Sequence, residues 1–145
     1  MSLFKSHHSH SEIETLTIAK NLSKTLNSKD IVFLNGPLGA GKSVMARGII
    51  RSLTQNPLED IPSPTFTLMQ QYDTPAGILW HYDLYRLNQA EEIYETGWED
   101  ILYQDILLIE WAEKLDHLTP HRYINIEITP KQNDERIIDI QKVGF

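Results

Sequence analysis

Residues 36–43 read Gly36-Pro37-Leu38-Gly39-Ala40-Gly41-Lys42-Ser43 and fit G-x-x-x-x-G-K-[ST], the pattern of a phosphate-binding loop. The apolar run 31–34 comes just before this P-loop and predicts a buried strand. After the loop, Met45, Ile49 and Leu53 recur at helical spacing. The motif therefore stands between a strand and a helix, which is the context that it requires, and a glycine-rich turn without a ligand is the alternative interpretation.

Each part of this loop has a task in binding a nucleotide. Glycines let backbone N–H groups point at the phosphates, and the helix N-terminus adds a partial positive charge. Lys42 can reach the β- and γ-phosphates, and the Ser43 hydroxyl can ligate Mg²⁺. We therefore expect nucleotide contacts along the loop and at the start of the helix, at Gly36, Leu38, Gly39, Ala40, Gly41, Lys42, Ser43 and Val44.

The composition of the 145-residue chain predicts a single globular domain over residues 1–145. The chain has no cysteine, which excludes disulfides and thiolate metal sites and suits a reducing cytoplasm. No apolar run approaches the roughly 18 residues of a membrane span, and the start does not read as a signal peptide. A net charge of −7 disfavours direct contact with DNA or RNA backbone, so a protein partner is expected to hold any RNA.

The hydrophobic pattern predicts an α/β fold with a mixed, mainly parallel central sheet, antiparallel hairpins and flanking helices. Helices are expected at 11–26, starting with a capping box of Ser11 and Glu14, at 42–54, at 88–95 behind an Asn88 cap, and at 111–115. Strands are expected at 31–34, 65–72, 78–83, 106–109, 123–129 and 136–140.

Some side chains are assigned to the core and some to a flexible terminus. The first helix is expected to bury Ile13, Leu16, Ala19, Leu22 and Leu26, and three aromatic residues, Phe66, Tyr72 and Trp80, are also expected in the core. Residues 1–10 are expected to be flexible. They carry His7, His8 and His10, for which metal binding is the less favoured interpretation because a mobile segment offers no scaffold.

Two carboxylates follow predicted strands and are candidates for chemistry beside a bound nucleotide. Glu110 ends an apolar strand, as the acidic residue of a Walker B motif does, and can reach Mg²⁺. Asp83 ends another strand and can position or deprotonate water, or else cap a helix or pair with Arg86. His81 shares the face of Asp83, and we favour a packed or hydrogen-bonded histidine over a catalyst.

Four blocks of sequence occur in a specific order and spacing: Gly36–Ser43, Ser63-Pro64-Thr65-Phe66-Thr67, His81-Tyr82-Asp83-Leu84-Tyr85-Arg86-Leu87 and Ile109-Glu110-Trp111-Ala112-Glu113. Together they resemble the TsaE (YjeE) family of small bacterial ATPases. The blocks lie within residues 31–115, and the predicted N-terminal helix and C-terminal hairpin also suit the family. The resemblance therefore covers nearly the whole chain.

The resemblance implies a Mg²⁺-dependent ATPase, a P-loop NTPase, that acts in tRNA modification with the proteins TsaD and TsaB. TsaC first makes threonylcarbamoyl-adenylate, and the pathway places threonylcarbamoyl on the adenosine next to the anticodon. The ATP cycle of TsaE is associated with resetting the TsaB–TsaD complex, which carries the tRNA. No membrane and no DNA are implied.

The resemblance also implies a role for particular residues. Lys42 would bind phosphates, Ser43 and Glu110 would hold Mg²⁺, and Asp83 would activate water. Thr65 would belong to a loop that senses the γ-phosphate, and Trp111 would lie beside the nucleotide. The chain departs mildly from the family pattern, since Pro37 stands where an acid is frequent and Ser43-Val44 where Thr-Thr is frequent.

Two alternatives remain for a protein with this loop. A small-molecule kinase would need an acceptor site and an Arg-bearing lid, but the stretch after Glu110 is short, and Arg122 and Arg136 lie in a predicted hairpin. A nucleotide sensor would bind MgATP without hydrolysing it. A phosphorylated product would identify the kinase, and tight binding without turnover would identify the sensor.

Overall fold

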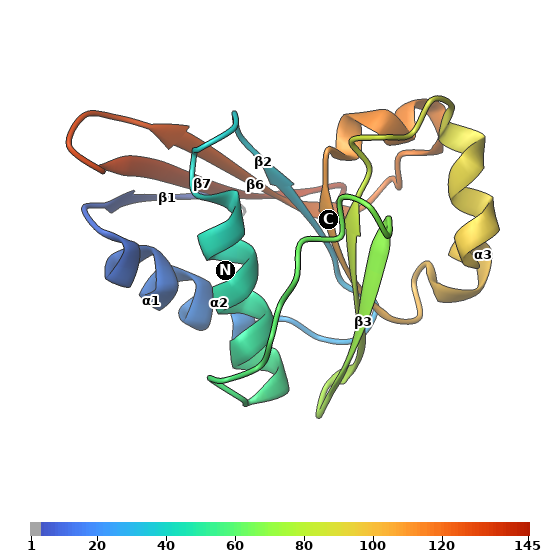
Figure 1. Ribbon diagram of the computed structural model, residues 1–145, viewed down its shortest axis with the longest axis horizontal. Coiled ribbons are helices and arrows are strands. Elements are labelled where there is room, and N and C mark those ends of the chain that lie inside the picture. The colour runs from blue at the N-terminus through green and yellow to red at the C-terminus, as the bar shows by residue number, and fades with distance from the viewer. Residues whose placement is uncertain (1–3) are drawn as a thin grey trace.

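The computed structural model describes residues 4–145, which form one seven-stranded sheet with helices packed against it (Figure 1). The elements along the chain are β1 (Phe4–Ser9), α1 (Glu12–Ser23), β2 (Ile31–Asn35), α2 (Lys42–Thr54), β3 (Met69–Thr74), β4 (Gly77–Asp83), the 3₁₀ helix η1 (Ala90–Thr96), α3 (Trp98–Ile101), β5 (Ile106–Glu110), the 3₁₀ helix η2 (Ala112–Leu118), β6 (Tyr123–Pro130) and β7 (Arg136–Val143). No helix of the described residues is long and apolar enough to cross a membrane.

The centre of the sheet is parallel and its edges are antiparallel. The strand order is β1-β7-β6-β2-β5-β4-β3, and the neighbours β6, β2, β5 and β4 all run in the same direction. The pairs β3–β4, β6–β7 and β1–β7 are antiparallel. The predicted α/β fold with a mixed sheet and flanking helices is confirmed.

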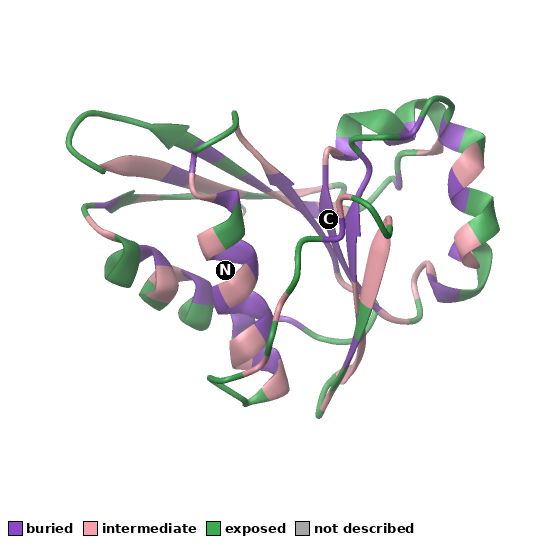
Figure 2. Cartoon of the chain, in the orientation of Figure 1, coloured by how far each residue is buried: buried purple, intermediate pink, exposed green. Residues whose placement is uncertain are grey.

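Helices cover both faces of the sheet, so the central strands are buried on both sides (Figures 1 and 2). Helices α1 and α2 pack on the face that carries Val32, Leu34 and Leu108. The chain from η1 to η2 packs on the other face, against Phe33 and Ile109. Every residue of β5 is buried, which explains why its sequence is a continuous apolar run rather than an alternating one.

The prediction of a flexible N-terminus is wrong for residues 4–9, which form β1 along the edge of β7. Residues 1–3 lie outside the described part. Strand β7 pairs with β6 along one side and with β1 along the other, so β1 provides the backbone hydrogen-bond partners that β7 would otherwise lack. Ser9 anchors the end of β1, because its buried hydroxyl bonds to the Thr15 hydroxyl (2.7 Å) and to the Ser11 carbonyl (2.8 Å).

Helix α1 is shorter than predicted; burial of Ala19 and Leu26 is confirmed, Leu16 and Leu22 are half-buried, and the prediction is wrong for Ile13. The buried positions of the helix are Thr15, Ala19 and Ser23, whereas Ile13 is 75% exposed. Ser11 caps the helix by accepting from the N–H of Glu14, as predicted. The Glu14 carboxylate, however, accepts from the N–H of His10 rather than from that of Ser11, so the capping box is only half formed.

Two other predicted elements begin later than expected. Residues 65–68 form a turn in which Leu68 has a φ of 72°, and β3 starts only at Met69. Phe66 lies on this turn, is 80% exposed instead of buried, and packs under the guanidinium of Arg86, 4.3 Å from the ring centroid. The helix expected at 88–95 is the 3₁₀ helix η1, and its cap is Gln89 instead of Asn88, in a capping box with Glu92.

Candidate active site

The carboxyl ends of three parallel strands bring the predicted site residues together. Strand β2 leads into the P-loop, β5 ends at Glu110, and β4 ends at Asp83, which pairs with Glu110 in the register of the two strands. These groups line one pocket of about 650 Å³. Ligands of open α/β sheets bind at such strand ends, and the volume is ample for a mononucleotide.

The P-loop leaves the start of α2 without a side-chain cap. Gly39 (φ 80°) and Gly41 (φ 104°) take left-handed conformations that other residues adopt only with strain. Gly41 is the N-cap of α2 and offers no side chain to the first N–H groups, and the first turn holds no acidic residue. An anion in the pocket would therefore meet unpaired N–H donors and the positive end of the helix dipole.

Lys42 is a buried cation without a carboxylate partner among the described residues. Its side chain is only 8% exposed, and its ammonium lies 4.4 Å from the ring centroid of Trp111. A cation–π contact is worth about 0.5–2 kcal/mol, which offsets only part of the cost of burying a charge. The Lys42 ammonium group can therefore also bind an anionic ligand. Trp111 itself is held against Tyr85, with ring centroids 5.0 Å apart.

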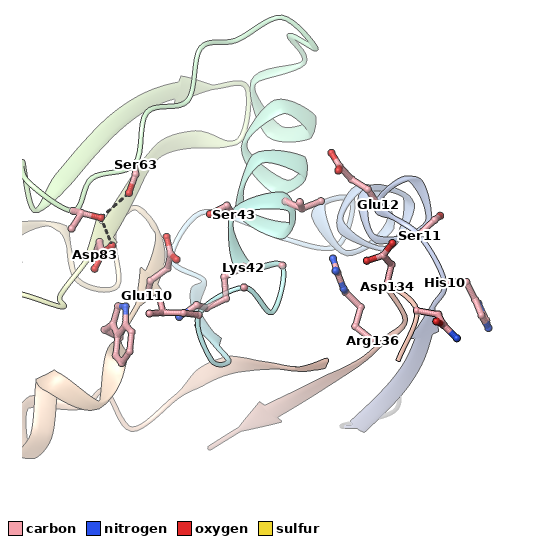
Figure 3. A pocket seen from close by; sticks show the side chains of 17 residues that line it. His10, Ser11, Glu12, Lys42, Ser43, Ser63, Asp83, Glu110, Asp134 and Arg136 are labelled. Atoms are coloured by element: carbon pink, nitrogen blue, oxygen red, sulfur yellow. Dashed lines mark hydrogen bonds between the residues drawn. The ribbon is translucent and has the colours of Figure 1, made fainter. Parts of the chain in front are cut away.

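Asp83 is held in place by the loop that precedes β3. Its Oδ2 accepts a hydrogen bond from the Thr65 hydroxyl (2.9 Å), and its Oδ1 accepts one from the N–H of Tyr85 (3.0 Å). The Thr65 hydroxyl also lies 2.7 Å from that of Ser63, so two hydroxyls and one carboxylate form a chain at the pocket wall (Figure 3). Within the described residues, Asp83 therefore neither caps a helix nor pairs with Arg86, the two alternative roles that the sequence left open.

Glu110 is buried beside Asp83 and is oriented by His81. Nε2 of His81 lies 2.7 Å from Oε2 of Glu110, and both residues are buried. Nδ1 of His81 has no hydrogen-bond partner among the described residues, which fits a tautomer that carries its proton on Nε2 and donates it to the carboxylate. His81 is therefore a buried, hydrogen-bonded histidine that positions Glu110.

The pocket has a second wall, on the side away from Asp83, that the sequence did not predict (Figure 3). It comes from the start of α1 and from the turn between β6 and β7, and its residues are His10, Ser11, Glu12, Asn133, Asp134 and Arg136. The guanidinium of Arg136 packs on the P-loop so closely that a Cβ on Gly41 would lie 2.6 Å from it. No local motif marks these residues, because antiparallel pairing of distant segments brings them to the P-loop.

Most of the predicted site residues line this single pocket: Leu38, Gly39, Gly41, Lys42, Ser43, Val44, Thr65, Asp83, Glu110 and Trp111. Gly36 instead lines a neighbouring hollow of about 340 Å³, which also reaches Lys42 and Trp111. Ala40 is fully buried, and its N–H donates to the carbonyl of Pro37, so this N–H is already used within the loop.

Comparisons with known proteins identify the family of the chain. A family described as "Threonylcarbamoyl adenosine biosynthesis protein TsaE" matches residues 9–138. The chain is 42% identical over 139 residues to the tRNA threonylcarbamoyladenosine biosynthesis protein TsaE of Rickettsia typhi, with 96% of each chain covered. It is 32% identical over 132 residues to the protein of that name from Bacillus subtilis, covering 90% of this chain and 81% of the relative.

The fold also has a solved counterpart. The crystal structure of YdiB from Bacillus subtilis superposes with a TM-score of 0.79 at 28% identity, covering 99% of this chain and 88% of that one. Sequence and fold therefore agree over nearly the entire length, and the chain belongs to the TsaE family.

Proposed function

We propose that this protein is a P-loop ATPase that binds MgATP in the pocket between the P-loop, Asp83 and Glu110, and that it works in threonylcarbamoyladenosine modification of tRNA. The observation that carries the proposal is the meeting of Lys42, Ser43, Asp83 and Glu110 in one pocket at the ends of adjacent strands. A P-loop alone holds phosphates, whereas hydrolysis also needs a second carboxylate and a group that orients water.

The residues of the pocket fit both ATP and Mg²⁺. Uncapped N–H groups of α2 and the unpaired Lys42 ammonium suit a polyphosphate. The Ser43 hydroxyl and the Glu110 carboxylate are oxygen donors, which Mg²⁺ prefers. Bound Mg²⁺ would supply charge neutralisation for the phosphates. Among the described residues that line the pocket, Lys42 is the only buried cation beside Asp83 and Glu110, so a divalent cation would also balance their charge.

The two carboxylates have different environments, which supports different tasks. Glu110 receives a hydrogen bond from His81, which fixes its orientation towards a metal. Asp83 accepts its bonds from a loop hydroxyl and a backbone N–H, so its carboxylate can turn to accept a proton from water when Thr65 moves. Thr65 thereby links the state of its loop to the group that would orient water.

The biological setting of the proposal rests on the family. The relatives are named for tRNA threonylcarbamoyladenosine biosynthesis. The resemblance adds TsaD and TsaB as partners, with ATP hydrolysis supporting the turnover of their complex in the cytoplasm. The net charge of −7 supports an indirect role, because a chain this acidic would repel the tRNA backbone.

Hydrolysis of MgATP by this chain, alone and with purified TsaB–TsaD, tests the proposal. We expect slow basal release of phosphate that rises with the pair and is lost in Lys42→Ala. Lys114→Ala is the matched control, because Lys114 is an exposed lysine on η2 that lies outside the pocket. Normal hydrolysis by Lys42→Ala would remove the P-loop from the mechanism, and no rise with an active pair would remove the partners.

The same assay separates the two alternatives. A kinase would release little phosphate and would yield a phosphorylated acceptor in a screen of small molecules. A sensor would bind MgATP tightly and release no phosphate, even with both partners present.

A further inference from the structure

Apart from Asp83 and Glu110, three side chains that can ligate a metal meet where β1 ends beside the start of β7. They are His8 in β1, His10 directly after it, and Glu135 just before β7. One ligand atom from each of the three lies within 4.8 Å of the others. The antiparallel register, which sets His8 opposite Ile137 and Ser9 opposite Arg136, brings these segments together although they are far apart in the chain.

The two histidines point at the same carboxylate. Nε2 of His8 lies 3.3 Å from Oε2 of Glu135, and Nε2 of His10 lies 3.9 Å from Oε1 of the same residue. Because His8 and His10 are two residues apart in extended chain, their side chains leave the same face, while Ser9 between them is buried. Ligand atoms around a tetrahedral Zn²⁺ lie about 3.3 Å apart, so only a small closure is needed.

A second carboxylate orients His10 from its other side. Nδ1 of His10 lies 3.0 Å from Oε2 of Glu14, which also accepts the backbone N–H of His10 at 2.6 Å. These two hydrogen bonds fix the orientation of the His10 ring relative to the backbone. Metal-binding histidines commonly donate one ring N–H to a carboxylate, which leaves the other nitrogen free to bind the ion. Glu14 stands in this supporting position.

A purely ionic explanation accounts for the cluster less well. The rings of His8 and His10 are stacked with centroids 4.2 Å apart and planes 13° apart, so charging both histidines to pair with the carboxylates would bring two positive charges together. Two protonated rings at this separation would repel each other. Two neutral rings that share a cation with Glu135 would not, because the cation supplies the positive charge.

We propose that His8, His10 and Glu135 bind a Zn²⁺ ion, with Glu14 as the carboxylate that positions His10. Zn²⁺ takes imidazole nitrogen together with carboxylate oxygen, and three protein ligands leave a fourth position for water. The ion would tie β1 to the turn before β7. It would also lie at the rim of the pocket, because His10 lines the pocket together with Asp134 and Arg136 (Figure 3).

Calorimetric titration of the tag-free, EDTA-treated protein with Zn²⁺, in excess Mg²⁺, tests this site. Excess Mg²⁺ competes with Zn²⁺ for the pocket carboxylates, and the histidine variants then show which site takes up the Zn²⁺. We expect one Zn²⁺ per chain with micromolar or tighter affinity, and no displacement by Mg²⁺ or Ca²⁺. At Zn²⁺ concentrations about 100 times Kd, the Tm should rise by about 5–10 °C.

Matched histidine variants locate the ion. His10→Gln should weaken Zn²⁺ binding by at least about 10-fold, and Glu14→Gln should weaken it by about 10-fold through the lost support. His7→Gln should leave the affinity unchanged, because His7 lies in the same strand but on the opposite face. His117→Gln is a second control, since His117 is an exposed histidine that pairs with Glu91 on another part of the surface.

Three results would overturn the proposal. The first is the lack of saturable binding of one Zn²⁺ per chain. The second is equal weakening by His7→Gln and His10→Gln. The third is full Zn²⁺ affinity in His8→Gln/His10→Gln, which would place the ion elsewhere. Circular dichroism of each variant checks that a loss of affinity is not a loss of fold.

Discussion

The two walls of the pocket are built in different ways. One wall is the P-loop with the ends of β4 and β5, where buried parallel strands and glycine conformations fix each group. The other wall is the start of α1 with the β6–β7 turn, where the antiparallel strands β1 and β7 bring side chains from distant segments together. Asp83, Glu110 and Lys42 on the first wall are buried, whereas His10, Glu12 and Asp134 on the second are exposed.

Because of this difference, substitutions in the two walls are expected to have different effects. Groups of the first wall have little freedom, because buried strands and hydrogen bonds hold them, and positioning of this kind is what catalysis requires. Most groups of the second wall face solvent, so each exposed charge contributes less to binding a ligand. We therefore expect changes in the first wall to abolish activity, and changes in the second to alter affinity or stability.

The largest effect is expected from Lys42→Ala. It removes a buried cation from the first wall, and hydrogen bonds to charged groups are worth about 1.5–3 kcal/mol each. MgATP affinity, measured by calorimetry, should fall by about 100-fold, while Lys114→Ala should bind as the unchanged protein does. Equal affinities for the two variants would mean that the P-loop wall does not hold the phosphates.

Glu110→Gln should separate binding from turnover. The amide keeps the shape of the side chain but loses the charge beside the metal, so hydrolysis should fall by about 100-fold while MgATP still binds. Phosphate release under single-turnover conditions measures this effect. Glu95→Gln, on the exposed surface of η1, is the control. Unchanged hydrolysis in Glu110→Gln would exclude Glu110 from the site.

Arg136→Ala tests whether the second wall takes part in binding at all. Its guanidinium packs on Gly41, and Nε has no hydrogen-bond partner among the described residues. Loss of the guanidinium should weaken MgATP binding by about 5-fold, as expected for one partly solvated charge. The rate of hydrolysis at saturating MgATP should change little. An effect as large as that of Lys42→Ala would contradict the contrast between the walls.

The smallest effect concerns Glu14, which supports His10 on the second wall. Hydrogen bonds from His10 lower the pKa of Glu14 from its usual 4.5. The ionised form is thus favoured in the folded state, so its stabilising effect is complete above about pH 4.5 and disappears as the pH falls through the lowered folded-state pKa. The Tm of the unchanged protein should exceed that of Glu14→Gln by about 1 °C at neutral pH and should match it in acid.

A pH-independent difference between these two proteins would show that the carboxylate acts through packing alone. The comparison is made without added Zn²⁺, so that metal binding does not contribute to the Tm.

Local sequence determined the parts of the protein that depend on neighbouring residues. The P-loop pattern placed α2 at residues 42–54, and the apolar run 106–109 placed the buried strand that ends at Glu110. The positions of Asp83 and Glu110 at strand ends followed from the alternating pattern that ends at Asp83 and from the apolar run 106–109 that ends at Glu110. The family resemblance rested on these same segments.

Only the tertiary structure decided the parts that depend on pairing between distant segments. The polar sequence of β1 gave no strand signal, but the edge of β7 supplies partners for its backbone. Phe66 is exposed because the turn at Leu68 delays β3, and Arg136 reaches the P-loop only because β7 runs antiparallel beside β6. The sequence by itself thus determined which residues form the first wall, because each of them follows a local strand or loop pattern, and the parallel pairing of β2, β5 and β4 brings them together. The histidine cluster and the second wall required long-range strand pairing, which no short pattern encodes.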